Sequence, residues 1–332
     1  MSNPTDGSRT LLYLSNADVV SIGPTIAETI PLVESILKAR GRGELIMPPK
    51  VPLFGSASNW YHAQLSYSPS MSRGAIKWQS GYPSNLGIGL PSIMGLLILN
   101  DGATGAPLVV MESGWLTAQR TGAVSAVTAR ALGKAEARSV SLIGCGKQAM
   151  TQLEALSEGL PLIEAIYLYD VDPQAAQRFE AWAADKFARL HFHVLDGARA
   201  AVEAADIVVT MGPIVKDAVR PIEADWLQAG ALGLPLDYDC YWSAAALRAV
   251  DRYFVDDLEQ YNGYRTHGEF FQDDVTVVGD LPNVLVGHVA GRETDQQRII
   301  SMNLGLAVED LAMAVEIARR AEAASIGQRL PL

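Results

Sequence analysis

The chain lacks the signatures of several large protein classes. It has only two cysteines, Cys145 and Cys240, which excludes a disulfide scaffold, and neither has a cysteine or histidine partner at the spacing of a metal site. The net charge of −11 comes without a block of lysine and arginine, so a nucleic-acid partner is not expected, because such binding depends on neutralising phosphates. The apolar runs are too short to span a bilayer, and the first ten residues lack the regions of a signal peptide. We therefore expect a cytoplasmic protein that binds no metal, nucleic acid or membrane.

The composition that remains is that of a globular enzyme. Hydrophobic residues make up 49% of the chain and charged residues 19%, which is ordinary for a soluble protein with a substantial core. A length of 332 residues is enough for two domains, each with its own core.

Helices and short strands are mixed in the first third of the chain. Ser15 and Asp18 indicate a capped helix N-terminus, and apolar spacing predicts a helix over 25–38. The segments predicted as strands are 75–78, 92–99 and 106–111. Between the last two, Asn100-Asp101-Gly102 predicts a hairpin, because these residue types tolerate positive φ. A helix rich in alanine and valine is predicted over 121–132.

From residue 138 onward, strands and helices alternate. The predicted strands are 140–143, 165–169, 192–194, 207–210, 231–236 and 253–255, with helices over 148–156 and 173–187. A long helical stretch over 295–324 closes the chain. Such alternation is typical of an α/β fold with a doubly wound, mostly parallel sheet and right-handed crossovers, as in Rossmann-type domains.

The strongest local motif is a glycine loop that follows the strand 140–143 and opens a helix. It has the form G-x-G-x-x-A, in which Gly144 allows the tight turn, Gly146 admits a pyrophosphate and Ala149 packs the helix against the strand. The candidate cofactor residues in and near this loop are Gly144, Gly146, Lys147, Gln148 and Ala149, together with Thr210 at the end of another strand. The alternative is a doubly wound domain in which the turn is merely tight.

Asp170 favours dinucleotide binding over that alternative. It ends the next strand, at the distance expected for a carboxylate that binds the ribose hydroxyls. A carboxylate there repels a 2′-phosphate, so NAD(H) is expected rather than NADP(H), which stays possible if Arg178 folds back toward the ribose.

Two cations are candidates for substrate binding. Lys77 lies in the middle of a predicted strand between Ile76 and Trp78, and a lysine in an alternating strand usually belongs to the solvated face. Arg120 stands at the start of an apolar helix, where a guanidinium must be paired or face a polar cleft. Its planar fork suits a carboxylate.

A carboxylate follows the predicted strand 231–236. Ligands of open parallel sheets bind beyond the carboxyl ends of the strands, so Asp239 is a candidate acid or base. Asp237 competes equally for this role, and either residue can instead serve only to form a turn.

Several motifs occur together in a fixed order. They are Lys77, the run Leu-Thr-Ala-Gln-Arg-Thr at 116–121, the glycine loop, Tyr-Asp-Val-Asp-Pro at 169–173, Gly291-Arg292 and Leu-Gly-Leu-Ala-Val-Glu-Asp at 304–310. Their combination resembles the ornithine cyclodeaminase/mu-crystallin family over nearly the whole chain from Leu11. The resemblance implies an NAD(P)-binding Rossmann domain over 126–304. It also implies a second, α+β domain for substrate binding and dimerisation, built from 1–125 and 305–332, and therefore a homodimer.

The resemblance also implies roles for single residues. Lys77 and Arg120 correspond to residues that bind the substrate carboxylate, and Lys77 belongs to the catalytic set as well. Lys50 stands where relatives use an arginine, Thr121 assists with the cofactor phosphates, and Asp239 corresponds to the catalytic carboxylate.

Two departures from the family pattern limit the range of reactions. Cyclodeaminases carry a catalytic glutamate shortly before the lysine that Lys77 matches, whereas the segment 60–67 contains no acidic residue. The Pro-Gly-Lys stretch that normally follows the catalytic aspartate is replaced by Cys-Tyr-Trp at 240–242. The first departure argues against ornithine cyclodeamination, and the second leaves the substrate open.

The sequence thus predicts an NAD(H)-dependent oxidoreductase that acts on the C–N bond of a small α-imino or α-amino acid. This means an imine or ketimine reductase or an amino acid dehydrogenase. Two alternatives stay open, namely an ornithine cyclodeaminase-type ammonia lyase with tightly bound NAD and a catalytically silent dinucleotide-binding protein.

Overall fold

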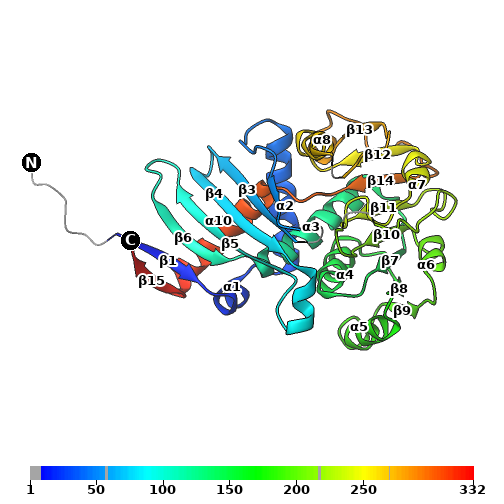
Figure 1. Ribbon diagram of the computed structural model, residues 1–332, viewed down its shortest axis with the longest axis horizontal. Helices are drawn as coiled ribbons and strands as arrows, with labels where there is room; N and C mark the ends of the chain where they lie inside the picture. Colours follow the sequence, from blue (N-terminus) through cyan, green and yellow to red (C-terminus); the bar gives the residue numbers. More distant parts are fainter. Residues whose placement is uncertain (1–8, 57–58, 216–217, 269) are drawn as a thin grey trace, which may run out of the picture. The chain divides into compact units, whose positions relative to one another are not determined.

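The computed structural model describes residues 9–56, 59–215, 218–268 and 270–332 and divides the chain into two units (Figure 1). Unit 1 comprises residues 1–25, 44–117 and 307–332, and unit 2 comprises residues 26–43 and 118–306. The division therefore falls near residues 117 and 306, where the resemblance implied 125 and 304. Residues 26–43 also differ from that expectation. They belong to unit 2 because helix α2 (Ile26–Gly41) packs against α4 (Lys147–Gly159) and α9 (Leu281–Leu285).

Unit 1 is built on a seven-stranded sheet with the order β15-β1-β6-β5-β4-β3-β2. Its strands are β1 (Thr10–Leu14), β2 (Val51–Phe54), β3 (Trp60–Ser68), β4 (Arg73–Gly81), β5 (Ile93–Asp101), β6 (Pro107–Glu112) and β15 (Gln328–Pro331). Its other elements are α1 (Asn16–Ile22), the 3₁₀ helix η1 (Pro83–Ile88) and α10 (Ala307–Ala324). All neighbouring strands pair antiparallel except β1 and β6, which run parallel.

Two local predictions for unit 1 are confirmed. Ser15 and Asp18 form a capping box at the start of α1, in which each side chain accepts a hydrogen bond from the other residue's backbone N–H. The β5–β6 hairpin is closed by Asp101, whose Oδ1 accepts hydrogen bonds from the N–H groups of Ala103 and Thr104 at 3.2 and 2.9 Å.

The two faces of the unit 1 sheet have different surroundings. Helix α10 packs along β3, β4 and β5 and covers one face (Figure 1). On that face the chain buries Leu97 and Leu99 of β5, but also Lys77 of β4. Trp78 belongs to the opposite face, where it is 45% exposed. A lysine in a strand usually points into solvent, but this expectation is wrong for Lys77. In β4 it is Lys77 that points to the covered face of the sheet and Trp78 that points to the open face.

Unit 2 contains an eight-stranded, entirely parallel sheet with the order β13-β12-β14-β11-β10-β7-β8-β9. Its strands are β7 (Ser139–Ile143), β8 (Ala165–Tyr169), β9 (His191–Val194), β10 (Ile207–Thr210), β11 (Leu232–Pro235), β12 (Arg252–Val255), β13 (Val277–Asp280) and β14 (Ile299–Met302). The remaining helices are α3 (Gly114–Leu132), whose first four residues belong to unit 1, α5 (Pro173–Lys186), α6 (Ala198–Ala204), α7 (Ala244–Arg248) and α8 (Leu258–His267). The strand order reverses between β7 and β10, which is the switch point of a Rossmann-type, doubly wound fold.

The predicted strands of unit 2 are confirmed, but the predicted helix over 295–324 is wrong. Residues 299–302 form the buried strand β14 between β11 and β12, and α10 begins only at Ala307. Gly305 lies between the two elements with a φ of +81°, which no helix allows. The helix predicted over 121–132 is longer than expected and begins at Gly114.

Within the described residues, no single helix has the length and apolarity needed to cross a membrane. Among these residues, α1 and α2 together are long and apolar enough, but they are separated by a sharp bend.

Candidate functional site

The glycine loop of unit 2 lies at the switch point of the sheet. It connects β7 to α4, and Gly144 adopts a φ of +101°, which favours glycine strongly. A side-chain carbon added to Gly146 would meet no atom within 4 Å, so the backbone there is open to a close ligand. Gly146 also caps α4 without a side-chain hydrogen bond, while Ala149 is fully buried against the core. The loop therefore fits a pyrophosphate at a helix N-terminus.

Asp170 is tied to this loop. It follows β8, and its Oδ2 accepts a hydrogen bond from the N–H of Cys145 at 2.7 Å, while Oδ1 accepts one from the N–H of Asp172 at 2.9 Å. These contacts fix the carboxylate beside the glycine loop. Arg178 does not reach back toward it but forms an ion pair with Asp172 at 3.1 Å.

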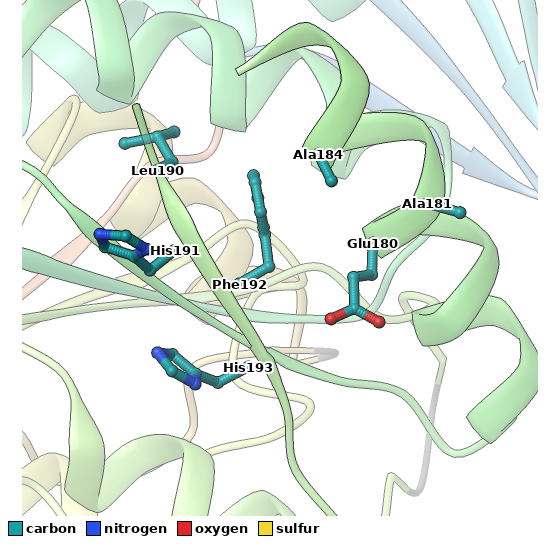
Figure 2. Close-up of a pocket in the computed structure, with 7 residues that line it drawn as sticks. All are labelled: Glu180, Ala181, Ala184, Leu190, His191, Phe192 and His193. Carbon is teal, nitrogen blue, oxygen red and sulfur yellow. The ribbon is translucent and has the colours of Figure 1, made fainter. Parts of the chain in front are cut away.

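A hollow of about 300 Å³ adjoins the loop. It is lined by Cys145, Gly146, Lys147, Met150, Ala175, Arg178, Phe179 and Trp182. A second surface hollow, of about 500 Å³, lies between α5 and the edge strand β9 (Figure 2). Figure 2 shows Phe192 turned toward α5 and Glu180, with His191 and His193 on the other side of β9. This second hollow contains none of the predicted site residues, and we assign it no function.

The remaining candidate cofactor residues have different surroundings. Lys147 is exposed and Gln148 half-buried in the first turn of α4, where the Gln148 amide donates to Thr151 Oγ1 at 3.3 Å. Thr121 is half-buried on α3, next to Arg120. Lys147 and Gln148 thus lie at the start of α4, and Thr121 lies beside Arg120.

Thr210 is committed to a buried network. Its hydroxyl donates to Asp237 Oδ1 at 2.8 Å and accepts from the Trp242 indole N–H at 3.2 Å. The other oxygen of Asp237 accepts from the N–H of Gly212 at 2.9 Å. Burial raises the pKa of Asp237 to about 7, against the lowering effect of these hydrogen bonds. Thr210 and Asp237 thus shape the turns after β10 and β11, and contact between Thr210 and a cofactor would have to use its backbone.

Asp239 has a more open position than Asp237. It is half-buried, and its Oδ2 accepts a hydrogen bond from the N–H of Phe271 at 2.9 Å. Burial raises the pKa of Asp239, while the Phe271 N–H and the charge of Arg220 oppose that shift. Both Tyr238 and Phe271 adopt φ values of +59°, which are strained for aromatic residues. One of these strained residues precedes Asp239 in the chain, and the other donates the hydrogen bond that holds its carboxylate.

Arg120 is buried within unit 2, with 6% of its surface exposed. Gly305 faces its guanidinium so closely that an added side-chain carbon would lie 2.4 Å from Nη1. The N–H of Gly305 is held by Asp256 Oδ2 at 2.6 Å, and its carbonyl accepts from the Gln260 amide at 3.2 Å. The glycine and its partners thus make room for the arginine.

Lys77 is the corresponding buried cation of unit 1. Its ammonium lies 2.7 Å from Asp310 Oδ2 of α10, and both side chains are 1% exposed. It also donates to Thr117 Oγ1 at 3.2 Å. Thr117 and Arg120 are three residues apart on α3, so their side chains lie on one face of this helix.

His62 lies near both Lys50 and Lys77, whose charges act on it. Lys50 and His62 are buried, with 7% and 4% of their surfaces exposed, and His62 stacks on Trp60 with ring centroids 4.2 Å apart. Burial lowers the pKa of His62 well below its ordinary value, and the charges of the two lysines lower it further. This lowering of the pKa favours the neutral form of His62, which adds no third charge to the cluster.

The sequence did not identify the partners of Lys77. Asp310, Thr117, Gln64 and Gln79 share its buried surroundings, but none was assigned a role. Polar residues at every second position of 62–66 were the available signal, since a sheet face that is covered by a helix is normally apolar.

A family model described as the ornithine cyclodeaminase/mu-crystallin family matches residues 13–325. A nodulation efficiency protein of Rhizobium meliloti is 34% identical over 316 residues, which cover 95% of this chain and 97% of that protein. The structure of Thermococcus litoralis Δ¹-pyrroline-2-carboxylate reductase in complex with NADH and L-proline matches with a TM-score of 0.86 and 26% identity, covering 96% of this chain and 100% of that chain. An archaeal alanine dehydrogenase dimer with bound NAD matches with a TM-score of 0.86 and 29% identity, covering 98% and 100%.

Proposed function

The chain belongs to the ornithine cyclodeaminase/mu-crystallin family, and we propose that it is an NAD(H)-dependent oxidoreductase acting on the C–N bond of a small α-imino or α-amino acid. The observation that carries this proposal is the burial of two cations, Lys77 on β4 and Arg120 on α3, among other polar side chains. Burying a cation is costly, and a purely structural sheet face or helix would be more stable with apolar residues. Buried cations with polar partners, such as Lys77 beside Asp310 and Thr117, are typical of a site that receives an anionic ligand.

The cofactor site favours NAD(H). Gly144 and Gly146 admit the pyrophosphate at the N-terminus of α4, and Asp170 stands where the ribose hydroxyls bind. A 2′-phosphate would meet the Asp170 carboxylate, and Arg178 is engaged by Asp172 rather than free to compensate. NADH, when bound, supplies the hydride that reduces the C=N bond.

Lys77 and Arg120 are proposed to bind the substrate carboxylate. The guanidinium of Arg120 offers two parallel hydrogen bonds, and the ammonium of Lys77 is oriented by Asp310 and Thr117. Lys50 adds positive charge beside His62, whose pKa is lowered by both Lys50 and Lys77. A carboxylate fixed in this way limits rotation of the reacting carbon, which is the positional part of catalysis.

Asp239 is proposed as the acid–base group in preference to Asp237. Both carboxyl groups have raised pKa values, because burial disfavours their charged forms. Asp237 is completely buried and its two oxygens are engaged by Thr210 and Gly212, so it cannot exchange protons with a ligand without losing that network. Asp239 is half-buried, and its carboxylate accepts a hydrogen bond from the backbone of Phe271, so it can keep a substrate nitrogen protonated.

A homodimer is proposed as the assembly. The face of the unit 1 sheet that α10 does not cover carries exposed apolar side chains, among them Trp78 and Leu96. The similar archaeal alanine dehydrogenase is described as a dimer. Exposed apolar patches of this kind mark interaction surfaces.

The test is a screen for NADH oxidation with Δ¹-pyrroline-2-carboxylate and with pyruvate, 2-oxobutyrate or 2-oxoglutarate in the presence of ammonium or methylamine. Net NADH consumption that requires the imine supports the proposal. Ammonia release from ornithine without net redox would identify a cyclodeaminase instead. Tight NADH binding without turnover of any compound would identify a silent binding protein, and both results would overturn the proposal.

A further inference from the structure

The buried face of β3 and β4 is polar where a covered sheet face is normally apolar. His62, Gln64 and Ser66 of β3 and Lys77 and Gln79 of β4 are all less than 7% exposed. Ser66 is accounted for by its hydrogen bond to the carbonyl of residue 307 at 3.0 Å. Gln64 and Gln79 are also buried, and their amides are hydrogen-bonded to each other inside this cluster.

A chain of hydrogen bonds runs through the cluster and ends at Gln64. Thr117 Oγ1 accepts from the Lys77 ammonium at 3.2 Å and from the Gln79 amide nitrogen at 3.4 Å. The Gln79 carbonyl oxygen in turn accepts from the Gln64 amide nitrogen at 3.5 Å. Gln64 Oε1 then remains as a buried acceptor that has no hydrogen-bond partner among the described residues.

The charge of Lys77 explains this orientation of the amides. Gln64 and Lys77 are directly paired across β3 and β4, so their side chains emerge side by side on the buried face. An amide oxygen beside an ammonium is favourable, whereas the reversed amide would place an NH₂ group beside the same positive charge. The group without a hydrogen-bond partner among the described residues is therefore an acceptor, Gln64 Oε1, and not a donor.

We propose that Gln64 is the residue that selects a C=N substrate over the corresponding 2-oxo acid, by accepting a hydrogen bond from the substrate nitrogen. This inference rests on the proposed function, in which Lys77 binds the carboxylate. In an α-imino acid the nitrogen and the carboxylate are carried by adjacent carbon atoms. A carboxylate on Lys77 therefore brings the nitrogen within reach of the neighbouring position across the strands, which is Gln64.

The selectivity follows from the hydrogen atoms of the two substrates. A protonated imine, cyclic or acyclic, carries an N–H that can donate to Gln64 Oε1. The carbonyl oxygen of a 2-oxo acid has only lone pairs, so it leaves Oε1 without a donor and adds repulsion between two acceptors. A site built to bond an N–H rejects the analogue that lacks it much more strongly than an apolar pocket does.

The experiment compares wild type with Gln64→Met, which keeps the length of the side chain and removes the acceptor. The activity measured is kcat/KM for NADH-dependent reduction of Δ¹-pyrroline-2-carboxylate, divided by that for pyruvate without ammonia. We expect the ratio to fall at least about tenfold in Gln64→Met. Gln64→Asn, which keeps an amide but withdraws it by one methylene, should lower the ratio in the same direction. Ser68→Ala removes a buried hydroxyl farther along the same face of β3 and should leave the ratio unchanged.

A binding measurement gives a readout apart from activity. L-proline and cyclopentanecarboxylate share a ring and a carboxylate, but only proline has N–H groups. In calorimetric titrations with NADH present, which cannot react with proline, Gln64→Met should weaken proline binding and leave cyclopentanecarboxylate binding unchanged. Gln64→Met also removes the buried hydrogen bond from Gln64 to Gln79, so the melting temperature of the ligand-free variant is compared with that of wild type to measure this structural effect.

The outcomes separate this inference from the proposed function. Suppose that wild type reduces the imine and binds proline, and that Gln64→Met keeps both the wild-type ratio of kcat/KM values and the wild-type affinity for proline. The assignment of Gln64 is then wrong, and the proposed function stands. If Gln64→Met melts at a lower temperature and retains the wild-type ratios, Gln64 has a structural role only, which also overturns the inference. If wild type neither reduces an imine nor binds proline, the proposed function itself fails.

Discussion

Arg120 and Lys77 share a charge but not a chemistry. The guanidinium of Arg120 is planar and packs against the backbone of Gly305, where any side chain would collide with it. Lys77 presents a single ammonium whose direction is set by Asp310 and Thr117. A carboxylate can accept two parallel hydrogen bonds from the former and one from the latter. We therefore expect Arg120 to be the less replaceable of the two.

Arg120→Lys tests this expectation. The substitution keeps the charge but removes the bidentate geometry, and a charge-assisted hydrogen bond is worth about 1.5–3 kcal/mol, so kcat/KM should fall roughly tenfold to a hundredfold. NADH affinity should hardly change, because the glycine loop and Asp170 hold the cofactor. Steady-state kinetics, a fluorescence titration with NADH and a melting temperature on the same preparation provide the measurement. A less stable protein with normal kcat/KM would show that Arg120 is structural.

Asp237 gives the protein a pH-dependent stability. Burial disfavours the charged form and raises the pKa of Asp237 from its ordinary value of 3.8 to about 7 in the folded chain. Between these values the native state binds the additional proton, so the contribution to stability is complete below about pH 4 and is lost as the pH rises through 7. The free energy of unfolding should therefore decrease with pH by up to about 1.4 kcal/mol per pH unit from this group alone.

Asp237→Asn should remove that dependence, since an amide does not titrate. Urea unfolding at pH 5, 6, 7 and 8 measures the slope for wild type and variant. Asp295→Asn, which removes an exposed carboxylate of the same unit, is the control and should keep the wild-type slope. Equal slopes for wild type and Asp237→Asn would mean that Asp237 is ionised throughout this range.

At the scale of elements, the end of β8 decides the cofactor. Asp170 holds the N–H groups of Cys145 and Asp172, which places its charge at the edge of the glycine loop. NADH should bind at least tenfold more tightly than NADPH, a difference of about 1.4 kcal/mol. Asp170→Asn should narrow this difference, whereas Asp185→Asn, near the end of α5, should preserve it. Equal affinities of the wild type for both cofactors in a fluorescence titration would contradict the assignment.

Local patterns predicted the elements around the glycine loop well. β7, β8 and β10 have the expected bounds within one residue, because buried parallel strands are short, apolar and bounded by turn residues. The loop residues follow from the same local chemistry, since a positive φ at Gly144 requires a glycine. The loop between β7 and α4 could therefore be predicted from local sequence alone.

Non-local features were harder to predict. The phase of β4, which buries Lys77 and exposes Trp78, depends on α10 covering one face of the sheet from more than 200 residues away. The strand β14 was predicted as part of a helix, because a short apolar segment has no period that separates the two structures. Gln64 could not be assigned from sequence, since its importance lies in an oxygen without a partner, which only coordinates reveal.

At the scale of the whole molecule, the unit 1 sheet presents an apolar face that the chain itself does not cover. Its exposed side chains are Val51, Leu53, Leu65, Trp78, Leu96 and Ile98, on four adjacent strands β2 to β5. The register aligns them, since Trp78 is paired directly with Leu96 and residue 76 with Ile98. Such a contiguous face on a sheet is stable in water only when a partner covers it.

We expect a second copy of the chain to be that partner, so that wild type sediments as a dimer at micromolar concentration. In a two-fold interface each substitution occurs twice, so Trp78→Lys introduces two like charges into one buried patch and should shift the protein to a monomer. Leu162→Lys, an exposed apolar position of unit 2 outside this sheet, should leave the dimer intact. Sedimentation velocity of wild type and both variants is the measurement, accompanied by circular dichroism to verify folding. A folded Trp78→Lys variant that still sediments as a dimer would place the interface elsewhere, and a monomeric wild type would exclude the assembly altogether.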